Sequence, residues 1–288
     1  MGELWVVATP IGHLGDMSER MKDALRDADL IAAEDTRVTM KLLSHMGISK
    51  HMVSCHRHNE RQKAPDLIRR IVEEDINVAL TSDAGTPGIS DPGFELVRLA
   101  HEMGVRVVPV CGPSAAVAAL SASGFDAREF TFYGFLPREK KPLREKLREI
   151  GGGTKVGVLY ESPHRVLELM RTIASELPGA VACVCCDITK RYESILVGEP
   201  GALATQMAAN PNVAKGEYVV VLDLSEVIQP EKPASPAAQG ADAHMVLAML
   251  AGATLAEAAE MAASSGFVRN EIYRAKLRIK AHFAGLWD

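Results

Sequence analysis

Short apolar runs alternate with amphipathic stretches through the first 124 residues. The apolar runs predict strands at Leu4–Ala8, Leu30–Ala33, Met52–Cys55, Val78–Thr81 and Val105–Val110. The amphipathic stretches predict helices at Ser18–Asp27, Thr39–His45, Pro65–Glu74, Phe94–Met103 and Ser114–Ala122. Because strands that alternate with helices favour a mainly parallel sheet, the predicted fold class is α/β.

A second set of elements begins after Gly124. It comprises the run Phe130–Leu136, the basic amphipathic stretch Arg138–Arg148, the run Lys155–Tyr160, a helix at Arg165–Glu176 and strands at Val181–Cys186 and Tyr218–Leu224. Glycine-rich loops are fewer in this half. We therefore expect a second α/β domain that closes a cleft over the first.

A change of composition follows the last predicted strand. Residues 229–240 are rich in Pro, Ala and Gln and predict a linker. Helices are expected at His244–Ala251, Ala256–Ser264 and Arg269–Ala281, the second behind a capping box that starts at Thr254. The predicted domains are thus 1–124, 125–228 and a helix-turn-helix-like appendage at 241–288. A basic, solvated helix that merely caps the preceding domain is the open alternative.

Composition places the chain among globular proteins. Its 288 residues exceed the ~250 at which single cores tend to split, and 47% are hydrophobic. No signal-peptide core follows Met1 and no apolar run is long enough to span a bilayer, so a cytoplasmic location is expected. Cys185 and Cys186 point to opposite faces of a strand, which favours reduced core thiols over a metal site.

The unusual sequences lie where the predicted strands end, and ligands of parallel α/β sheets bind at that edge. These segments are Thr9–Asp16, Glu34–Arg37, His56–Glu60, Ser82–Gly93 and Cys111–Ala115. None carries the GxGxxG fingerprint of nicotinamide enzymes, a phosphate-binding GxxxxGK[ST] loop or a zinc-binding HExxH. Loops of small residues instead suit a compact cofactor held through main-chain groups.

Several of these motifs, in this order, resemble the tetrapyrrole methylase superfamily and, within it, the bacterial 16S rRNA (cytidine-2′-O)-methyltransferases. The motifs are Thr9–Asp16, Ala33–Arg37, His58–Glu60, Ser82–Gly93, Gly112–Ala115, Tyr160–Arg165 and Lys215–Glu217. The resemblance covers about residues 4–224, and 241–288 look like that family's helical appendage. It implies S-adenosylmethionine as donor between two α/β domains, a homodimer, and a decoding-site cytidine of the small ribosomal subunit as target.

The resemblance also implies which residues bind the cofactor. They are Pro10, Gly12, Asp83, Ala84, Gly85, Thr86, Pro87, Pro113, Ser114 and Ala115. Turn glycines without a ligand, and helix capping by Ser114, are the alternatives. Two departures stand out: His13 replaces the family's usual Asn, and the segment Cys186–Lys190 lacks the family's Arg.

A ribose hydroxyl is a poor acid, so a base, or a charge that stabilises the alkoxide, should assist in-line transfer. Candidates lie in Glu34-Asp35, His58-Asn59-Glu60, Glu161 and Lys190. We favour Glu60 or Asp35 as base or orienting residue, with Arg37 and Lys190 near phosphate or alkoxide. Alternatively, Asp35 caps a helix and Lys190 pairs with Glu193 on the surface. No metal is expected.

The net charge of −5 does not indicate nucleic-acid binding, but local charge does. Basic residues at 138–148 lie beside Phe132, Tyr133 and Phe135, and the last predicted helix is basic. A methyltransferase for a tetrapyrrole or another small molecule is the nearest rival function. A nonenzymatic RNA-binding assembly factor is the second, and a nicotinamide oxidoreductase is the third.

Overall fold

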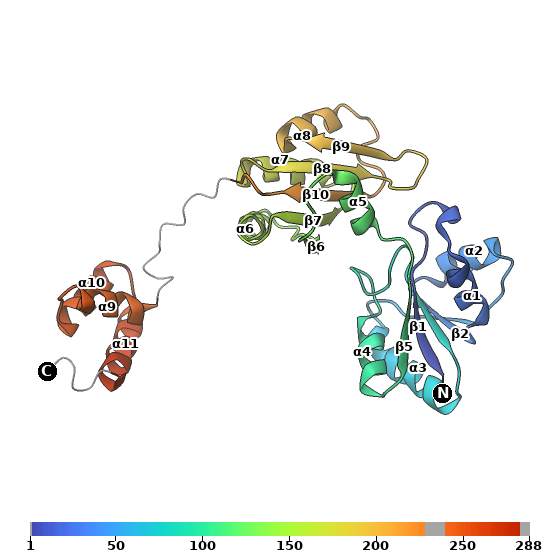
Figure 1. Cartoon of the computed structure of the whole chain (residues 1–288), viewed down its shortest axis with the longest axis horizontal. Coiled ribbons are helices and arrows are strands. Elements are labelled where there is room, and N and C mark those ends of the chain that lie inside the picture. The colour runs from blue at the N-terminus through green and yellow to red at the C-terminus, as the bar shows by residue number, and fades with distance from the viewer. Residues whose placement is uncertain (1, 228–239, 283–288) are drawn as a thin grey trace. The chain divides into compact units, whose positions relative to one another are not determined.

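The computed structural model describes residues 2–227 and 240–282, which fall into two compact units divided after residue 228 (Figure 1). The first unit holds two lobes, each built on its own five-stranded sheet. The predicted linker, Gly240 apart, lies outside the described residues.

The first sheet is entirely parallel and has the order β3-β2-β4-β1-β5. Its strands are β1 (Glu3–Val7), β2 (Leu30–Ala33), β3 (Met52–Ser54), β4 (Val78–Thr81) and β5 (Arg106–Val110). Every residue of β2 and β4 is buried, because apolar clusters cover both faces of the sheet. The predicted parallel α/β arrangement is confirmed.

The helices of this lobe begin with recognisable signals. They are α1 (Glu19–Asp27), α2 (Thr36–His45), α3 (Glu60–Glu73) and α4 (Phe94–Glu102), with a short 3-10 helix, η1, at Leu14–Asp16. Ser18 Oγ accepts a bond of 3.1 Å from the Met21 amide and caps α1. The prediction began α3 at Pro65, which lies inside the helix; the preceding turn adds the buried Glu60.

The second sheet is mixed, with the order β6-β7-β10-β8-β9. Its elements are β6 (Thr131–Phe135), α6 (Lys140–Gly151), β7 (Val156–Glu161), α7 (Val166–Glu176), β8 (Val181–Cys186), β9 (Ser194–Gly198), α8 (Pro200–Ala208) and β10 (Tyr218–Asp223). Only β6 and β7 pair in parallel. The prediction omitted β9 and α8, an exposed edge strand and a short helix rich in small residues.

Helix α5 (Ala115–Ser123) connects the two lobes. Its buried residues Ala116, Ala119 and Leu120 pack on the second sheet, against Val158 and its neighbours. The sequence prediction placed this helix in the first domain. By packing it belongs to the second lobe, so the chain changes lobe close to the start of α5.

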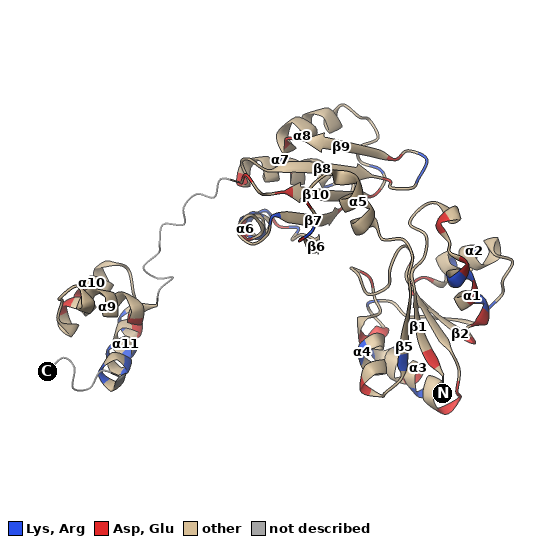
Figure 2. Ribbon diagram, viewed as in Figure 1, with Lys and Arg blue, Asp and Glu red and all other residues tan. Residues whose placement is uncertain are grey.

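The second unit is a three-helix bundle of α9 (Ala241–Leu250), α10 (Leu255–Ser264) and α11 (Arg269–His282). Its own apolar cluster includes Met245, Phe267 and Ile279. The predicted capping box is present, with Thr254 and Glu257 each bonding the other's amide. Figure 2 shows the basic residues along α11.

Two further expectations concern membranes and thiols. Within 2–227 and 240–282, no helix combines the length and apolarity that a membrane span requires. Cys183 and Cys185 are buried on one face of β8, with their Sγ atoms 3.7 Å apart. Cys111 is exposed, so it is not a core thiol.

Candidate active site

A cavity of about 410 Å³ lies between the lobes of the first unit, at the carboxyl ends of the parallel strands. Six of the predicted cofactor residues line it: Asp83, Ala84, Gly85, Thr86, Ser114 and Ala115. A neighbouring cavity of about 350 Å³ includes Pro10, Gly12 and Lys190 in its lining. Pro87, Pro113, Asp35 and Glu60 are outside both linings.

Three loops meet at the first cavity. Gly85 and Thr9 exchange backbone hydrogen bonds of 3.0 and 2.8 Å, and Thr86 Oγ1 donates to the Pro113 carbonyl at 3.3 Å. Gly85 has φ +81°, a conformation that glycine adopts most readily. The segment Ser82–Gly93 is therefore tied to the first loop and to the start of α5 while its backbone lines the cavity.

The amino end of α5 also lines this cavity. Ser114 is the N-cap residue, and its side chain accepts no capping hydrogen bond. The predicted alternative, in which Ser114 merely caps the helix, thus finds no support in the geometry. Because first-turn amides carry partial positive charge, this end of α5 suits a ligand carboxylate.

Carboxyl groups line the wall that the first lobe contributes. Glu34 Oε2 accepts from the Asp83 amide at 3.2 Å, and Asp83 Oδ1 accepts from the Asp35 amide at 3.0 Å. Burial raises the pKa of Glu34 and Asp83. Burial, and then repulsion from these two groups, raises the pKa of Asp91 to about 6, against a small opposing effect of Arg57.

The second lobe contributes a buried carboxyl and aromatic rings. Glu161 is 2% exposed, and its Oε1 accepts from the Ser162 amide at 2.7 Å. Its Oε2 lies 3.3 Å from the Arg165 guanidinium but accepts no hydrogen bond. Tyr160 makes an edge contact with the exposed Phe135, their ring centroids 5.8 Å apart.

Lys190 reaches the second cavity from the loop after β8. Its Nζ pairs with Glu217 at 2.9 Å and with Asp187 at 3.3 Å, rather than with Glu193. Burial alone would lower the pKa of Lys190, but these two carboxylates outweigh it and the pKa is raised. Lys190 therefore stays protonated at neutral pH and can act as a fixed positive charge, not as a base.

The first loop approaches Lys190 closely. A Cβ on Gly12 would lie 2.6 Å from Lys190 Cγ and 2.8 Å from Thr189 Oγ1, so any larger residue there would have to displace these two side chains. The His13 amide donates to Thr189 Oγ1 at 3.1 Å. Since this contact uses the backbone, it does not depend on the side chain that replaces the family's Asn.

Asp35 takes the alternative role that the sequence allowed. It is the N-cap of α2, and its Oδ1 accepts from the Arg37 amide at 2.8 Å. Hydrogen bonds from Arg37 hold the pKa of Asp35 at about 2. A carboxylate of such low basicity is a poor proton acceptor at neutral pH, so the geometry favours helix capping over general-base chemistry.

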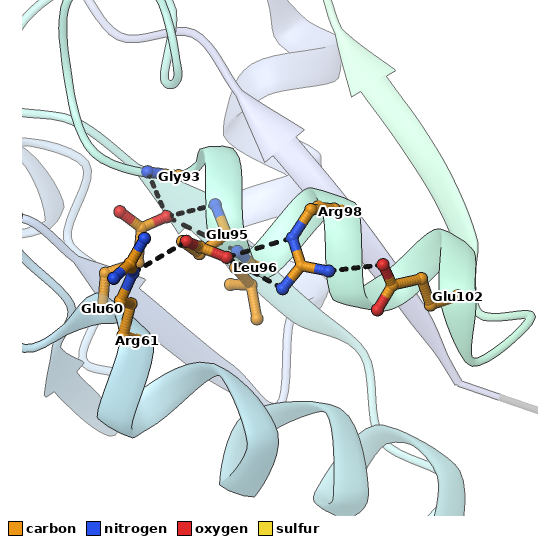
Figure 3. A network of polar contacts seen from close by, with 7 residues as sticks. All are labelled: Glu60, Arg61, Gly93, Glu95, Leu96, Arg98 and Glu102. Atoms are coloured by element: carbon orange, nitrogen blue, oxygen red, sulfur yellow. Dashed lines mark hydrogen bonds and ion pairs between the residues drawn. The ribbon is translucent and has the colours of Figure 1, made fainter.

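Glu60 anchors the other end of the Ser82–Gly93 loop (Figure 3). Its buried Oε1 accepts from the amides of Gly93, Glu95 and Leu96 at 2.9, 2.7 and 3.4 Å. A carboxylate at the amino end of α4 is favoured by the helix dipole. Of the two predicted roles for Glu60, base or orienting residue, these contacts favour a positioning role.

Sequence reasoning missed Asp91, the second aspartate of the Ser82–Gly93 loop. Its place in that loop was the available signal, since the first aspartate, Asp83, was already a candidate. Its burial beside Glu34 depends on how β2 and β4 pair, which no local pattern reveals.

Comparison with known proteins gives a consistent result. Residues 3–204 match the family model of the Tetrapyrrole (Corrin/Porphyrin) Methylases. The ribosomal RNA small subunit methyltransferase I of Escherichia coli O157:H7 is 40% identical over 276 residues, covering 95% of this chain and 94% of that protein. Its counterpart from Xylella fastidiosa (strain Temecula1) is 44% identical over 222 residues, covering 77% and 81%.

Solved structures share the fold at low identity. The methyltransferase CobJ aligns with a TM-score of 0.57 and 19% identity, over 77% of this chain and 94% of that one. Uroporphyrin-III C-methyl transferase from Thermus thermophilus, complexed with S-adenyl homocysteine, aligns with a TM-score of 0.53 and 14% identity, over 77% and 97%.

Proposed function

We propose that this chain, which belongs to the tetrapyrrole methylase family and within it to the ribosomal RNA small subunit methyltransferase I group, methylates the 2′-hydroxyl of a decoding-site cytidine in 16S rRNA. It is an S-adenosylmethionine-dependent methyltransferase of small subunit rRNA. The identity of the nucleotide and of the reacting oxygen is the part proposed.

The observation that carries the proposal is the convergence of the cofactor loops on one cavity. Its volume of about 410 Å³ lies within the range of small-molecule sites. The amino end of α5, where the Ser114 side chain makes no capping bond, fits a methionine carboxylate, and Gly85 and Thr86 lie on a loop that hydrogen bonds to Thr9 and Pro113 hold in place. When bound, S-adenosylmethionine supplies a methyl group already activated on a sulfonium.

The second cavity suits the RNA. Its lining includes two lysines, Lys41 and Lys190, beside two carboxyls, Asp83 and Glu217, whereas the lining of the first cavity includes five carboxyls and neither lysine nor arginine. Among the predicted catalytic residues, Lys190 lines a cavity and keeps its proton. It would stabilise the developing alkoxide or hold a phosphate, while alignment of the two reacting atoms supplies much of the rate.

Two further proposals concern the oligomeric state of the protein and its location in the cell. A homodimer is proposed from the family resemblance, and sedimentation velocity would measure it as a species of twice the chain mass of 31.0 kDa. A cytoplasmic location is proposed because assembly of small ribosomal subunits takes place there.

The experiment is transfer of labelled methyl from S-adenosylmethionine to purified small ribosomal subunits, naked 16S rRNA and a tetrapyrrole precursor in parallel, followed by nucleoside analysis. Label in 2′-O-methylcytidine is the expected result. Label in the tetrapyrrole would instead support the small-molecule rival. Absence of transfer by folded protein that still binds RNA would support the nonenzymatic assembly factor.

A further inference from the structure

Carboxyl groups form an acidic wall in the first cavity. Neither a donor carboxylate nor an RNA phosphate would be attracted by it. The carboxyl groups in the lining are Glu34, Asp83, Asp91, Glu161 and Glu217. Such a concentration of negative charge, partly removed from water, indicates a cationic group in the ligand.

Asp91 is the member of this wall with the least protein contact. Within the described residues, the Asp91 carboxylate accepts no hydrogen bond and forms no ion pair, whereas Glu34 and Asp83 each accept from an amide. Arg57 is the nearby cation, but its Nη2 donates to the Ser90 carbonyl at 3.1 Å. Tyr160 of the second lobe lines the same cavity, and burial, followed by a smaller effect of the Asp91 carboxylate, raises its pKa.

Glu161 points independently to the same kind of ligand. Its side chain is fully buried in the lining of this cavity, and Oε2 accepts no hydrogen bond although Arg165 lies 3.3 Å away. A buried carboxylate oxygen without a donor is rare in folded proteins, and an incoming donor or cation would satisfy it. Asp91 on the first lobe therefore offers a carboxylate with neither a hydrogen bond nor an ion pair among the described residues, and Glu161 on the second lobe, although ion-paired with Arg165, offers a carboxylate oxygen without a hydrogen-bond donor.

We propose that Asp91, with Glu34 and Asp83 beside it, binds the sulfonium of S-adenosylmethionine and so selects the charged donor over its neutral product. This inference rests on the proposed function. Methyl transfer breaks the S–C bond, leaves the electron pair on sulfur, and forms the O–C bond to the hydroxyl, whose proton goes to solvent. The charge that Asp91 attracts is lost in that step, so product is released more readily than donor.

The amino end of α5 and the acidic wall would then bind different groups of the same ligand. The α5 amides take the methionine carboxylate, and the carboxylates take the positive sulfur a few bonds away. If Asp91 instead contacts the amino group or a ribose hydroxyl, it contributes equally to donor and product, because both molecules carry those groups.

Titration calorimetry at pH 7.5 with S-adenosylmethionine and S-adenosylhomocysteine tests this difference. For Asp91→Asn, we expect the preference for donor over product to fall about fivefold relative to wild type. Asp91→Glu keeps the charge and should keep most of the preference. Glu73→Gln, which removes an exposed carboxylate from α3 outside both cavities, should leave it unchanged.

The preference should also depend on pH. Since the pKa of Asp91 is raised to about 6, wild type should lose donor preference between pH 7.5 and pH 5 as this carboxylate takes up a proton. In Asp91→Asn the remaining dependence should be shallower.

Equal weakening of both ligands in Asp91→Asn, with unchanged circular dichroism, would overturn the inference. Failure of wild type to bind either ligand would instead overturn the proposed function.

Discussion

Substitution of Gly85 tests whether the Ser82–Gly93 loop binds the cofactor. A Cβ there would lie 3.4 Å from Ile11 Cγ2 on the cavity lining, and Gly88 offers a matched control with nearly the same positive φ but open space around it. Both Gly→Ala variants should lose about 1–2 kcal/mol of unfolding free energy. Gly85→Ala alone should weaken S-adenosylmethionine binding, roughly tenfold by calorimetry, and equal affinities in the two variants would contradict the assignment.

Lys190 should act on the RNA reaction more than on the cofactor. Lys190→Gln removes one of the two lysine charges that line the second cavity, so we expect kcat/KM for small subunits to fall by about tenfold or more. Cofactor affinity should change less than transfer. Lys140→Gln removes an ion-paired lysine on α6 and should leave both quantities unchanged. Full methyl transfer by Lys190→Gln would remove Lys190 from the mechanism.

At the scale of residues, the sequence indicated where ligand contacts gather but not how charges are paired. The small-residue loops were found because glycine and proline mark them locally. The sequence predicts the capping of α2 by Asp35 as an alternative, and hydrogen bonds from Arg37 lower the pKa of that carboxyl. The partners of Glu60 lie far along the chain, as does Glu217 among those of Lys190, so no local pattern could reveal them, whereas Asp187 is only three residues from Lys190.

Among the elements, α4 and the loop before it depend on Glu60. Glu60→Ala leaves three amides without their acceptor and should cost about 1–3 kcal/mol in urea unfolding. Glu60→Gln keeps an acceptor oxygen, should cost less, and should retain methyl transfer with an unchanged pH profile.

Glu102→Gln is the control for Glu60→Gln, since Glu102 lies exposed at the carboxyl end of α4, the helix whose amino end Glu60 contacts (Figure 3). A loss of transfer of about a hundredfold or more in folded Glu60→Gln would restore Glu60 as the base.

Elements with a strong local pattern were predicted well, and those shaped by tertiary contacts were not. β2 and β4 are continuous apolar runs because the parallel sheet is covered on both faces. β9 exposes Ile195 and Val197 at the edge of its sheet, and α8 contains small residues that give little amphipathic contrast. The assignment of α5 to a lobe follows from packing, which sequence order does not determine.

For the whole molecule, the basic patches differ in how much charge is available to RNA. Four cations on α6 are in ion pairs, namely Lys140, Arg144, Lys146 and Arg148. The positive charge of the RNA-binding surface predicted there is therefore largely neutralised. On α11, Arg278 pairs with Asp242, whereas Arg269, Arg274 and Lys280 have no ion pair among the described residues. RNA attraction should therefore come more from α11 (Figure 2).

Replacing these three α11 cations with Gln should weaken binding to small subunits by about tenfold and reduce its salt dependence. Cofactor affinity should not change. The matched control replaces Arg20, Lys22 and Arg26 of α1 with Gln, which lowers the net charge equally. If both triple variants weaken RNA binding to the same extent, net charge rather than α11 would be responsible.

The cavity between the lobes should orient the methyl donor for transfer to RNA. A crystal structure of the protein with S-adenosylhomocysteine would test this orientation. We predict the ligand carboxylate at the amino end of α5, its sulfur beside Asp91, and its reactive side facing the cavity of Lys190. A ligand bound elsewhere, or one whose amino group rather than sulfur faces Asp91, would contradict the account.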